Sequence, residues 1–245
     1  MSFKIVLSDN GLFKDAFEAI STIVDEVACH IDSEGFRVSA LDRSHIVFTS
    51  LNLKPTVFDE FECSKPEKVT IDTSEFMKVL KRMKGHDSLS LSLEENNLII
   101  GVSGDVDRTF KIRLIDMEYE SQEPPYIEYN VSVEVPSSLF NESIKDMDLF
   151  SEKLDIAVDE DYLIINTDGE FGDGSVKYLH GCDVSEYVKS CFSIPKLKDI
   201  FKASKFSDIV EICLGNDMPV TFNFNLVSDD GSMSFLLAPR LEETD

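Results

Sequence analysis

The residues of this sequence best suited to chemistry are an aspartate near a histidine and two acidic segments. Asp42 and His45 have the spacing of an acid–base pair, but no nucleophile or orienting third group accompanies them. The sequence therefore favours a role for His45 in shaping a turn. Segment 159–161 is an acidic strand-joining turn, and segment 168–174 lacks the ligand order and closing glutamate of an EF-hand loop. A metal-dependent nuclease or phosphohydrolase is accordingly the weaker alternative.

The cysteines offer no obvious metal or disulfide framework. Their number is odd, and no Cys-x-x-Cys pair occurs among Cys29, Cys63, Cys182, Cys191 and Cys213. Scattered cysteines without ligand spacing are typical of reduced thiols in a reducing compartment. The chain also lacks the G-x-x-x-x-G-K-[ST] phosphate loop. We therefore expect no metal, no cofactor and no catalytic residue.

Charge sets a strong constraint on partners. The chain has 23 basic and 47 acidic residues, a net charge of −24, and an isoelectric point near 4.4. This balance argues against nonspecific adhesion to nucleic acid, so any such role depends on where the cations lie. Ten of the 23 fall in four segments with helical periodicity: Lys14, Lys78, Lys81, Arg82, Lys84, Lys145, Lys196, Lys198, Lys202 and Lys205.

Two of these segments place their cations in stripes. Lys78, Lys81 and Arg82 follow an i, i+3, i+4 spacing, and Lys198, Lys202 and Lys205 follow i, i+4, i+7. Either stripe could be an ordinary solvated helix face, or a surface that contacts phosphates without reading bases. The helix expected at 11–24 and the one that opens at 136–139 weaken the second interpretation, since each carries one lysine beside acidic neighbours.

The elements that carry these residues form a repeated plan. Segment 3–7 alternates as a strand does, and segment 11–24 has one apolar helical face. Three strands are then expected, at 26–31, 37–41 and 46–53. The same order recurs from residue 131, with a helix opening at 136–139. Each half is doubled again, with helices at 74–84, capped by Asp72 and stopped by Gly85, and at 195–203, opened by Pro195.

Four copies of a strand–helix–three-strand unit predict an α+β fold with four short helices and about sixteen strands in antiparallel sheets. We expect two similar lobes, residues 1–115 and 129–245, joined by the acidic linker 116–128 with its Pro124-Pro125 pair. No apolar run approaches the ~18 residues that cross a bilayer, and the amino terminus lacks a secretion signal. These features favour a cytoplasmic protein without membrane partners.

Three motifs in the right order resemble the proliferating cell nuclear antigen (PCNA) family. Segment 35–51 (GFRVSALDRSHIVFTSL) is similar to the family's strand, Asp-x-Ser-His turn and following strand. Segment 168–177 (DGEFGDGSVK) is similar to its second-half turn, and segment 236–240 (LLAPR) to its carboxyl terminus. Length and tail look closer to archaeal members. The resemblance implies a DNA sliding clamp and polymerase processivity factor for replication and repair, with no enzymatic activity.

The resemblance also implies the DNA clamp fold, closing as a homotrimeric ring with helices inside and antiparallel sheets outside. The ten helix cations would face sequence-independent double-stranded DNA in the hole. In the family, sheet edges join the subunits; the corresponding residues here are Thr109, Lys111 and Arg113 on one edge, and Ser175, Lys177 and Leu179 on the other. A subunit of a heterotrimeric or checkpoint clamp is the alternative within the family.

Partners implied by the resemblance are a separate clamp loader, DNA polymerase and other proteins that carry a PCNA-interacting peptide. The protein would be associated with the nucleoid, or be nuclear in a eukaryotic source. At least one of Leu41, Ile46 and Phe48 is expected to be a core residue. The family's peptide pocket corresponds to Leu41, His45, Ile46, Phe48, Pro219, Leu236, Ala238 and Pro239, with Pro125 and Tyr126 added from the linker.

Overall fold

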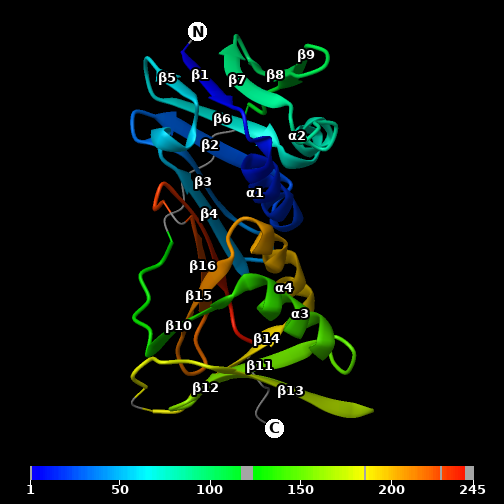
Figure 1. Ribbon diagram of the computed structural model, residues 1–245, viewed down its shortest axis with the longest axis vertical. Coiled ribbons are helices and arrows are strands. Elements are labelled where there is room, and N and C mark those ends of the chain that lie inside the picture. Colours follow the sequence, from blue (N-terminus) through cyan, green and yellow to red (C-terminus); the bar gives the residue numbers. More distant parts are fainter. Residues whose placement is uncertain (1, 117–123, 185, 227, 241–245) are drawn as a thin grey trace. The chain divides into compact units, whose positions relative to one another are not determined.

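The computed structural model describes residues 2–116, 124–184, 186–226 and 228–240, which form two compact units (Figure 1). The first half of the chain makes most of the first unit, and residues from 124 onward make most of the second. Two short segments are exceptions. Residues 44–48 belong to the second unit, and residues 226 and 228–233 belong to the first. The predicted linker lies partly outside the described residues, at 117–123, so the lobe boundary stays a prediction.

The first unit contains two helices and two sets of antiparallel strands. One set has the order β5-β1-β7-β8-β9, and the other has the order β4-β3-β2-β6. The elements are β1 (Phe3–Leu7), α1 (Asn10–Ile23), β2 (Glu26–Asp32), β3 (Gly35–Leu41), β4 (Val47–Leu53, which begins in segment 44–48), the 3-10 helix η1 (Pro55–Val57), β5 (Glu60–Cys63), β6 (Glu67–Asp72), α2 (Thr73–Leu80), β7 (Ser88–Glu94), β8 (Asn97–Ser103) and β9 (Arg108–Arg113).

The second unit repeats this plan. Its strands have the orders β13-β12-β11-β14 and β10-β15-β16-β17. The elements are β10 (Val131–Pro136), α3 (Ser137–Met147), β11 (Lys153–Val158), β12 (Tyr162–Gly169), β13 (Gly172–Leu179), β14 (Val188–Ser193), α4 (Ile194–Ile200), the 3-10 helix η2 (Phe201–Lys205), β15 (Ile209–Leu214), β16 (Val220–Asn225) and β17 (Gly231–Leu237, which begins in the segment shared with the first unit).

Local sequence explains where the helices begin. The Asp72 carboxylate accepts the Glu75 N–H at 2.9 Å and so caps α2, as predicted. Asp9 caps α1 in the same way through the Gly11 N–H. Pro195 occupies the first turn of α4, where its missing N–H costs no hydrogen bond.

A phenylalanine cluster fills the space between helices and sheet in each unit. In the first unit, the rings of Phe17 on α1 and Phe76 on α2 lie 4.8 Å apart, centroid to centroid. In the second, Phe201 contacts Phe140 at 4.9 Å and Phe222 at 5.1 Å. Such ring pairs stabilise a core beyond the area that they bury. The helices of each unit are thereby fixed on one side of its sheets, with their other side open to solvent.

Two predicted helices end earlier than expected. α2 ends at Leu80 instead of Lys84, because the Lys84 N–H is bonded to the Asp87 side chain and the Arg82 and Met83 N–H groups make short i→i−3 bonds. Gly85 therefore does not end α2, although the sequence predicts that it would. α4 ends at Ile200 and continues as η2. The strand β5 and the 3-10 helix η1 were not predicted. No helix in the described part of the chain is long and apolar enough to span a membrane.

Candidate functional site

The cations of the first unit differ in how far they are neutralised. Lys78 is ion-paired with a glutamate of its own helix, and Lys84 lies 2.8 Å from an exposed aspartate. Lys81 and Arg82 are exposed in the turn after α2 and have no ion pair with any described residue. Lys14, on α1, is half-buried. Lys81 and Arg82 are therefore the most available of these cations for an external phosphate.

The cations of the second unit are more completely paired. Lys145 contacts Glu142 at 2.6 Å, and Lys198 contacts Asp148 at 2.6 Å. Lys202 lies 3.2 Å from an aspartate one turn earlier. The remaining two, Lys196 and Lys205, also make polar or electrostatic interactions. Exposed pairs of this kind are worth at most about 1 kcal/mol, so phosphate oxygens can compete for these lysines.

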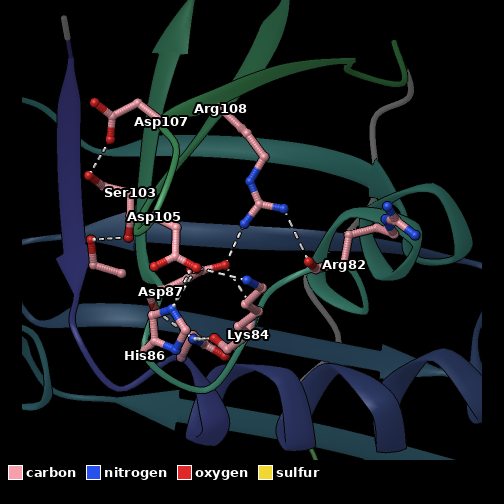
Figure 2. Close-up of polar contacts among 10 residues, drawn as sticks. Arg82, Lys84, His86, Asp87, Ser103, Asp105, Asp107 and Arg108 are labelled. Carbon is pink, nitrogen blue, oxygen red and sulfur yellow. Dashed lines mark hydrogen bonds and ion pairs between the residues drawn. The ribbon is translucent and has the colours of Figure 1, made fainter.

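The turn that carries Lys81 and Arg82 is built around Asp87 (Figure 2). The Asp87 carboxylate, 2% exposed, accepts the Lys84 backbone N–H at 2.9 Å and pairs with the Arg108 guanidinium. The Lys84 N–H, followed by the Arg108 charge, holds the pKa of Asp87 below its usual value, although burial acts in the opposite direction. This aspartate and this arginine were not identified from the sequence.

Each unit contains one of the two strands expected at a subunit interface, and each is an edge strand. In the described part of the chain, β9 pairs only with β8, and β13 pairs only with β12. One side of each strand therefore presents unpaired backbone N–H and C=O groups. The six expected interface residues are all exposed: Thr109, Lys111 and Arg113 on β9, and Ser175, Lys177 and Leu179 on β13.

An apolar group beside β13 was not predicted. Leu149 and Phe150 follow α3 and are both exposed, and Phe171 is exposed at the tip of the β12–β13 hairpin. The hairpin approaches the Phe150 backbone so closely that a Cβ at Gly169 would lie 1.9 Å from the Phe150 carbonyl oxygen. The sequence signal of this group, a Leu-Phe pair directly after a helix, is equally typical of core residues and does not identify it alone.

Most of the predicted peptide pocket lies in the second unit. The Ala238 N–H donates to the Ile46 carbonyl at 2.9 Å, which brings the carboxyl-terminal segment against the turn before β4. His45 in that turn is exposed, and its φ of 58° is left-handed, consistent with a turn-shaping residue. Ile46 is exposed, and Leu236 is half-buried on β17.

The other predicted pocket residues are placed differently. Phe48 is 5% exposed and packs as a core residue. Pro219 and Pro239 are half-buried, whereas Pro125 and Tyr126 are exposed, Tyr126 to 94%. Leu41 is half-buried and belongs to the first unit. The structure thus joins Ile46 with Ala238 through a hydrogen bond and leaves Ile46 exposed beside the half-buried Leu236 and Pro239.

The residues that the sequence offered as candidates for catalysis are Asp42, His45 and the acidic turn 159–161, and the structure gives them structural positions. Asp42 is buried whereas His45 is exposed. The Asp159 carboxylate accepts hydrogen bonds from the N–H groups of Asp161 and Tyr162 at 2.9 and 2.7 Å. These bonds close the β11–β12 turn and lower the pKa of Asp159. Among the described residues, no group of three or more His, Cys, Asp or Glu side chains is arranged to hold a metal ion.

Comparison with known proteins covers nearly the whole chain. Residues 2–123 match the family model described as proliferating cell nuclear antigen, N-terminal domain, and residues 123–240 match that of the C-terminal domain. A protein of Methanobrevibacter smithii named DNA polymerase sliding clamp is 53% identical over 240 residues, covering 98% of each chain. A protein of the same name from Thermococcus gammatolerans is 34% identical, covering 99% of this chain and 100% of the other.

The fold also matches a solved structure over nearly its whole length. A crystal structure of PCNA from Thermococcus kodakaraensis has a TM-score of 0.91 and 27% identity, and the match covers 97% of this chain and 100% of that chain.

Proposed function

The chain belongs to the proliferating cell nuclear antigen family and is a DNA polymerase sliding clamp, and from this premise we propose that three copies close head to tail around duplex DNA. A closed ring of identical subunits needs two different, complementary surfaces on each copy. The observation that carries the proposal is the pair of edge strands, β9 in the first unit and β13 in the second. Antiparallel pairing of β9 with β13 of the next copy would satisfy the open backbone groups of both.

The two edges have complementary chemistry. β9 carries Arg108, Lys111 and Arg113 and no acidic residue. Arg108 is paired with Asp87 and Lys111 with Glu94 of β7, which leaves Arg113 as the cation of this strand without an ion pair among the described residues.

β13 itself carries one exposed aspartate, Asp173, and one exposed lysine, Lys177. Beside it, the exposed carboxylates of Glu142 and Asp146 on α3, the helix that packs against that strand, make this edge acidic. The exposed Leu-Phe pair after α3 adds apolar area to the same edge. Charge would orient the two edges, and apolar burial would supply affinity.

Sparse cations suit a protein that must slide. Each lysine or arginine that neutralises a phosphate makes affinity more salt-dependent, and many such contacts would hold the ring in place. In our proposal Lys81 and Arg82, with the paired lysines of α3, α4 and η2, make weak phosphate contacts. The strongly acidic remainder of the chain repels the duplex, and closure of the ring retains it.

Partners dock, in this proposal, on the second unit at the surface formed by the turn before β4 and the carboxyl-terminal segment. Ile46, Leu236 and Pro239 would receive the aliphatic and aromatic anchors of a PCNA-interacting peptide. Replacing Leu236 and Pro239 together by alanine should weaken binding of such a peptide about tenfold, because two apolar anchors are lost. Titration calorimetry measures this, and an unchanged affinity with a folded variant would place the pocket elsewhere.

The protein carries out no reaction in this proposal, and opening the ring requires a separate ATP-driven loader. Incubation with labelled DNA and Mg²⁺ or Mn²⁺ should release no product. Metal-dependent cleavage that disappears in Asp42→Ala would contradict a purely tethering role.

The ring itself is tested by mass in solution. Size exclusion with light scattering should give about 83 kDa, three times the 27.6 kDa chain. A purified polymerase and loader should then show longer products on primed circular DNA when the chain is added. A stable dimer would contradict the ring, and a monomer that acts only with other subunits would favour a heterotrimeric clamp.

The lining cations are tested separately from the ring. Lys81→Glu combined with Lys202→Glu should reduce polymerase stimulation about tenfold at moderate salt while the mass stays at three copies. Stimulation equal to that of the unmodified chain would remove these two lysines from the DNA contact.

A further inference from the structure

The Asp87 carboxylate is an unusual buried charge within an exposed basic turn. Its Oδ2 atom accepts the Lys84 N–H at 2.9 Å and also pairs with Arg108. The Asp87 N–H in turn donates to the Lys84 carbonyl at 3.0 Å, and the Asn10 side chain of α1 donates to that carbonyl at 2.8 Å. A buried carboxylate is retained only when its partners satisfy it. Here those partners come from the turn itself and from β9, while Asn10 of α1 holds the backbone of the turn.

Arg108 connects this turn to the edge strand. One guanidinium nitrogen pairs with the Asp87 carboxylate, and the other donates to the Arg82 carbonyl at 3.1 Å (Figure 2). The planar guanidinium has a fixed fork of donors, so two contacts determine its orientation as well as its position. Because Arg108 is the first residue of β9, the same contacts fix the start of that strand relative to the turn.

The loop between β8 and β9 confines the carboxylate from the remaining side. A Cβ at Gly104 would lie 2.0 Å from the Asp87 Oδ1 atom, so this loop packs directly on the carboxylate. His86 of the turn lies close to both the carboxylate and this loop, with its Nε2 atom 3.8 Å from Asp87 Oδ1 and 3.5 Å from Oδ2 of Asp105 in the loop. The carboxylate thus has little freedom to move without displacing the turn or the loop.

We propose that Asp87 is a positioning residue that couples the cationic turn after α2 to the edge strand β9, so that ring closure and the DNA-facing cations share one fixed geometry. This inference rests on the proposed ring. Asp87 is enclosed within its own unit and acts through Arg108 and the Lys84 backbone. If the contact between Arg108 and Asp87 is broken, the edge strand and the turn both lose the interaction that holds them in place.

The test compares three variants in the full-length chain. Asp87→Asn keeps the shape but removes the charge, and should raise the dissociation constant of the ring about tenfold, because a charge-assisted hydrogen bond becomes a neutral one. Gly104→Ala displaces the carboxylate without altering any charge and should act in the same direction. Asp107→Asn removes the same charge one residue from Arg108 and should change the constant less than twofold, since the Asp107 side chain bonds only to Ser103 among the described residues.

The dissociation constant is measured by sedimentation over a dilution series, alongside the melting temperature and polymerase stimulation. In Asp87→Asn, stimulation should fall at protein concentrations where the unmodified ring is intact and recover at higher concentrations. A lower melting temperature with a dissociation constant within twofold of the original would make Asp87 merely structural and overturn the inference. If the unmodified chain itself forms no ring, the proposed function fails instead, independently of Asp87.

Discussion

The edge strands β9 and β13 are each the third strand after a helix, β9 after α2 in the first unit and β13 after α3 in the second, yet each is attached to that helix segment by different chemistry. In the first unit an ion pair joins Arg108 of β9 to Asp87 beyond α2. In the second unit the Tyr178 hydroxyl of β13 donates to the Leu139 carbonyl of α3 at 3.0 Å and shares a hydrogen bond with Ser143. The Tyr178 ring also stacks on Phe140, with centroids 6.2 Å apart.

The difference shows that one architectural requirement, a fixed edge strand, can be met by charge or by a neutral phenol. A charged attachment depends on pH and leaves a buried ion if one partner is lost. A neutral attachment depends mainly on packing and on two ordinary hydrogen bonds. The two edges of each proposed interface should therefore respond differently to the same perturbation.

The largest difference is expected at the exposed outer sides of the two strands. Leu179→Glu should raise the dissociation constant of the ring at least about 100-fold, because an apolar side chain that becomes buried contributes roughly 1.5–3 kcal/mol and a charge there must be desolvated. Lys111→Glu on β9 should raise it about tenfold or less, since exposed charges are screened. Light scattering over a dilution series measures both constants, and equal effects would remove the distinction between the two edges.

Next in size is the cost of removing each attachment. Tyr178→Phe should destabilise the chain by about 1–2 kcal/mol, since its hydrogen bonds are lost while the ring still packs. Arg108→Ala should lower the free energy of unfolding at least twice as much, because it leaves the buried Asp87 carboxylate without its cation. Urea unfolding followed by circular dichroism measures both values. An Arg108→Ala variant as stable as Tyr178→Phe would show that the ion pair is not the stronger attachment.

The two attachments should also fail at opposite ends of the pH scale. Asp87 has a pKa below its ordinary 3.8, so its contribution is complete above that value and is lost as pH falls through the lower folded-state pKa. Burial raises the pKa of Tyr178 above its ordinary 10.0, so its contribution is complete below pH 10.0 and is lost as pH rises through the higher folded-state pKa.

Matched variants isolate these two groups from the other titrating residues. The stability difference between the unmodified chain and Asp87→Asn should shrink below pH 3.8, and the difference from Tyr178→Phe should shrink above pH 10.0. Thermal unfolding across this range provides the measurement. A difference that stays constant on either side would mean that the group concerned does not stabilise the fold through its charge state.

The smallest effect is expected from Ser143→Ala. Tyr178 keeps its bond to the Leu139 carbonyl in this variant, so the loss should be about 0.5–1 kcal/mol. Ser138→Ala, an exposed position earlier on the same helix, is the control and should change the free energy of unfolding by less than about 0.5 kcal/mol. A larger loss at Ser143 would mean that its hydroxyl is required to orient the phenol.

Local patterns of neighbouring residues were predictable from the sequence, whereas contacts between residues far apart in the sequence were not. Alternating apolar residues located most of the strands, though not β5, and Asp72 with Glu75 located the start of α2, because these signals are local. The end of α2 was wrong, since it depends on a side chain three residues beyond Lys84. The Asp87–Arg108 pair, 21 residues apart, has no local signature.

The functional residues divide in the same way. Spacing on a helix identified the cations. Their ion pairs with acidic side chains decide which of them are available to phosphate, and those pairs depend on the three-dimensional arrangement. The resemblance implied both the strands β9 and β13 and their place at sheet edges, and the topology of the described residues has them there. The exposed Leu149-Phe150 pair was overlooked because two apolar residues after a helix usually enter a core.

The short segments that each unit takes from the other half of the chain have a consequence for biosynthesis. The first unit includes residues 228–233, so it is incomplete until those residues have left the ribosome. The amino-terminal half would therefore lack this segment if it folded first during synthesis, as domains commonly do. For the same reason, separate expression of fragments divided at the linker would leave each unit without a strand segment, and co-expression would be needed to restore both.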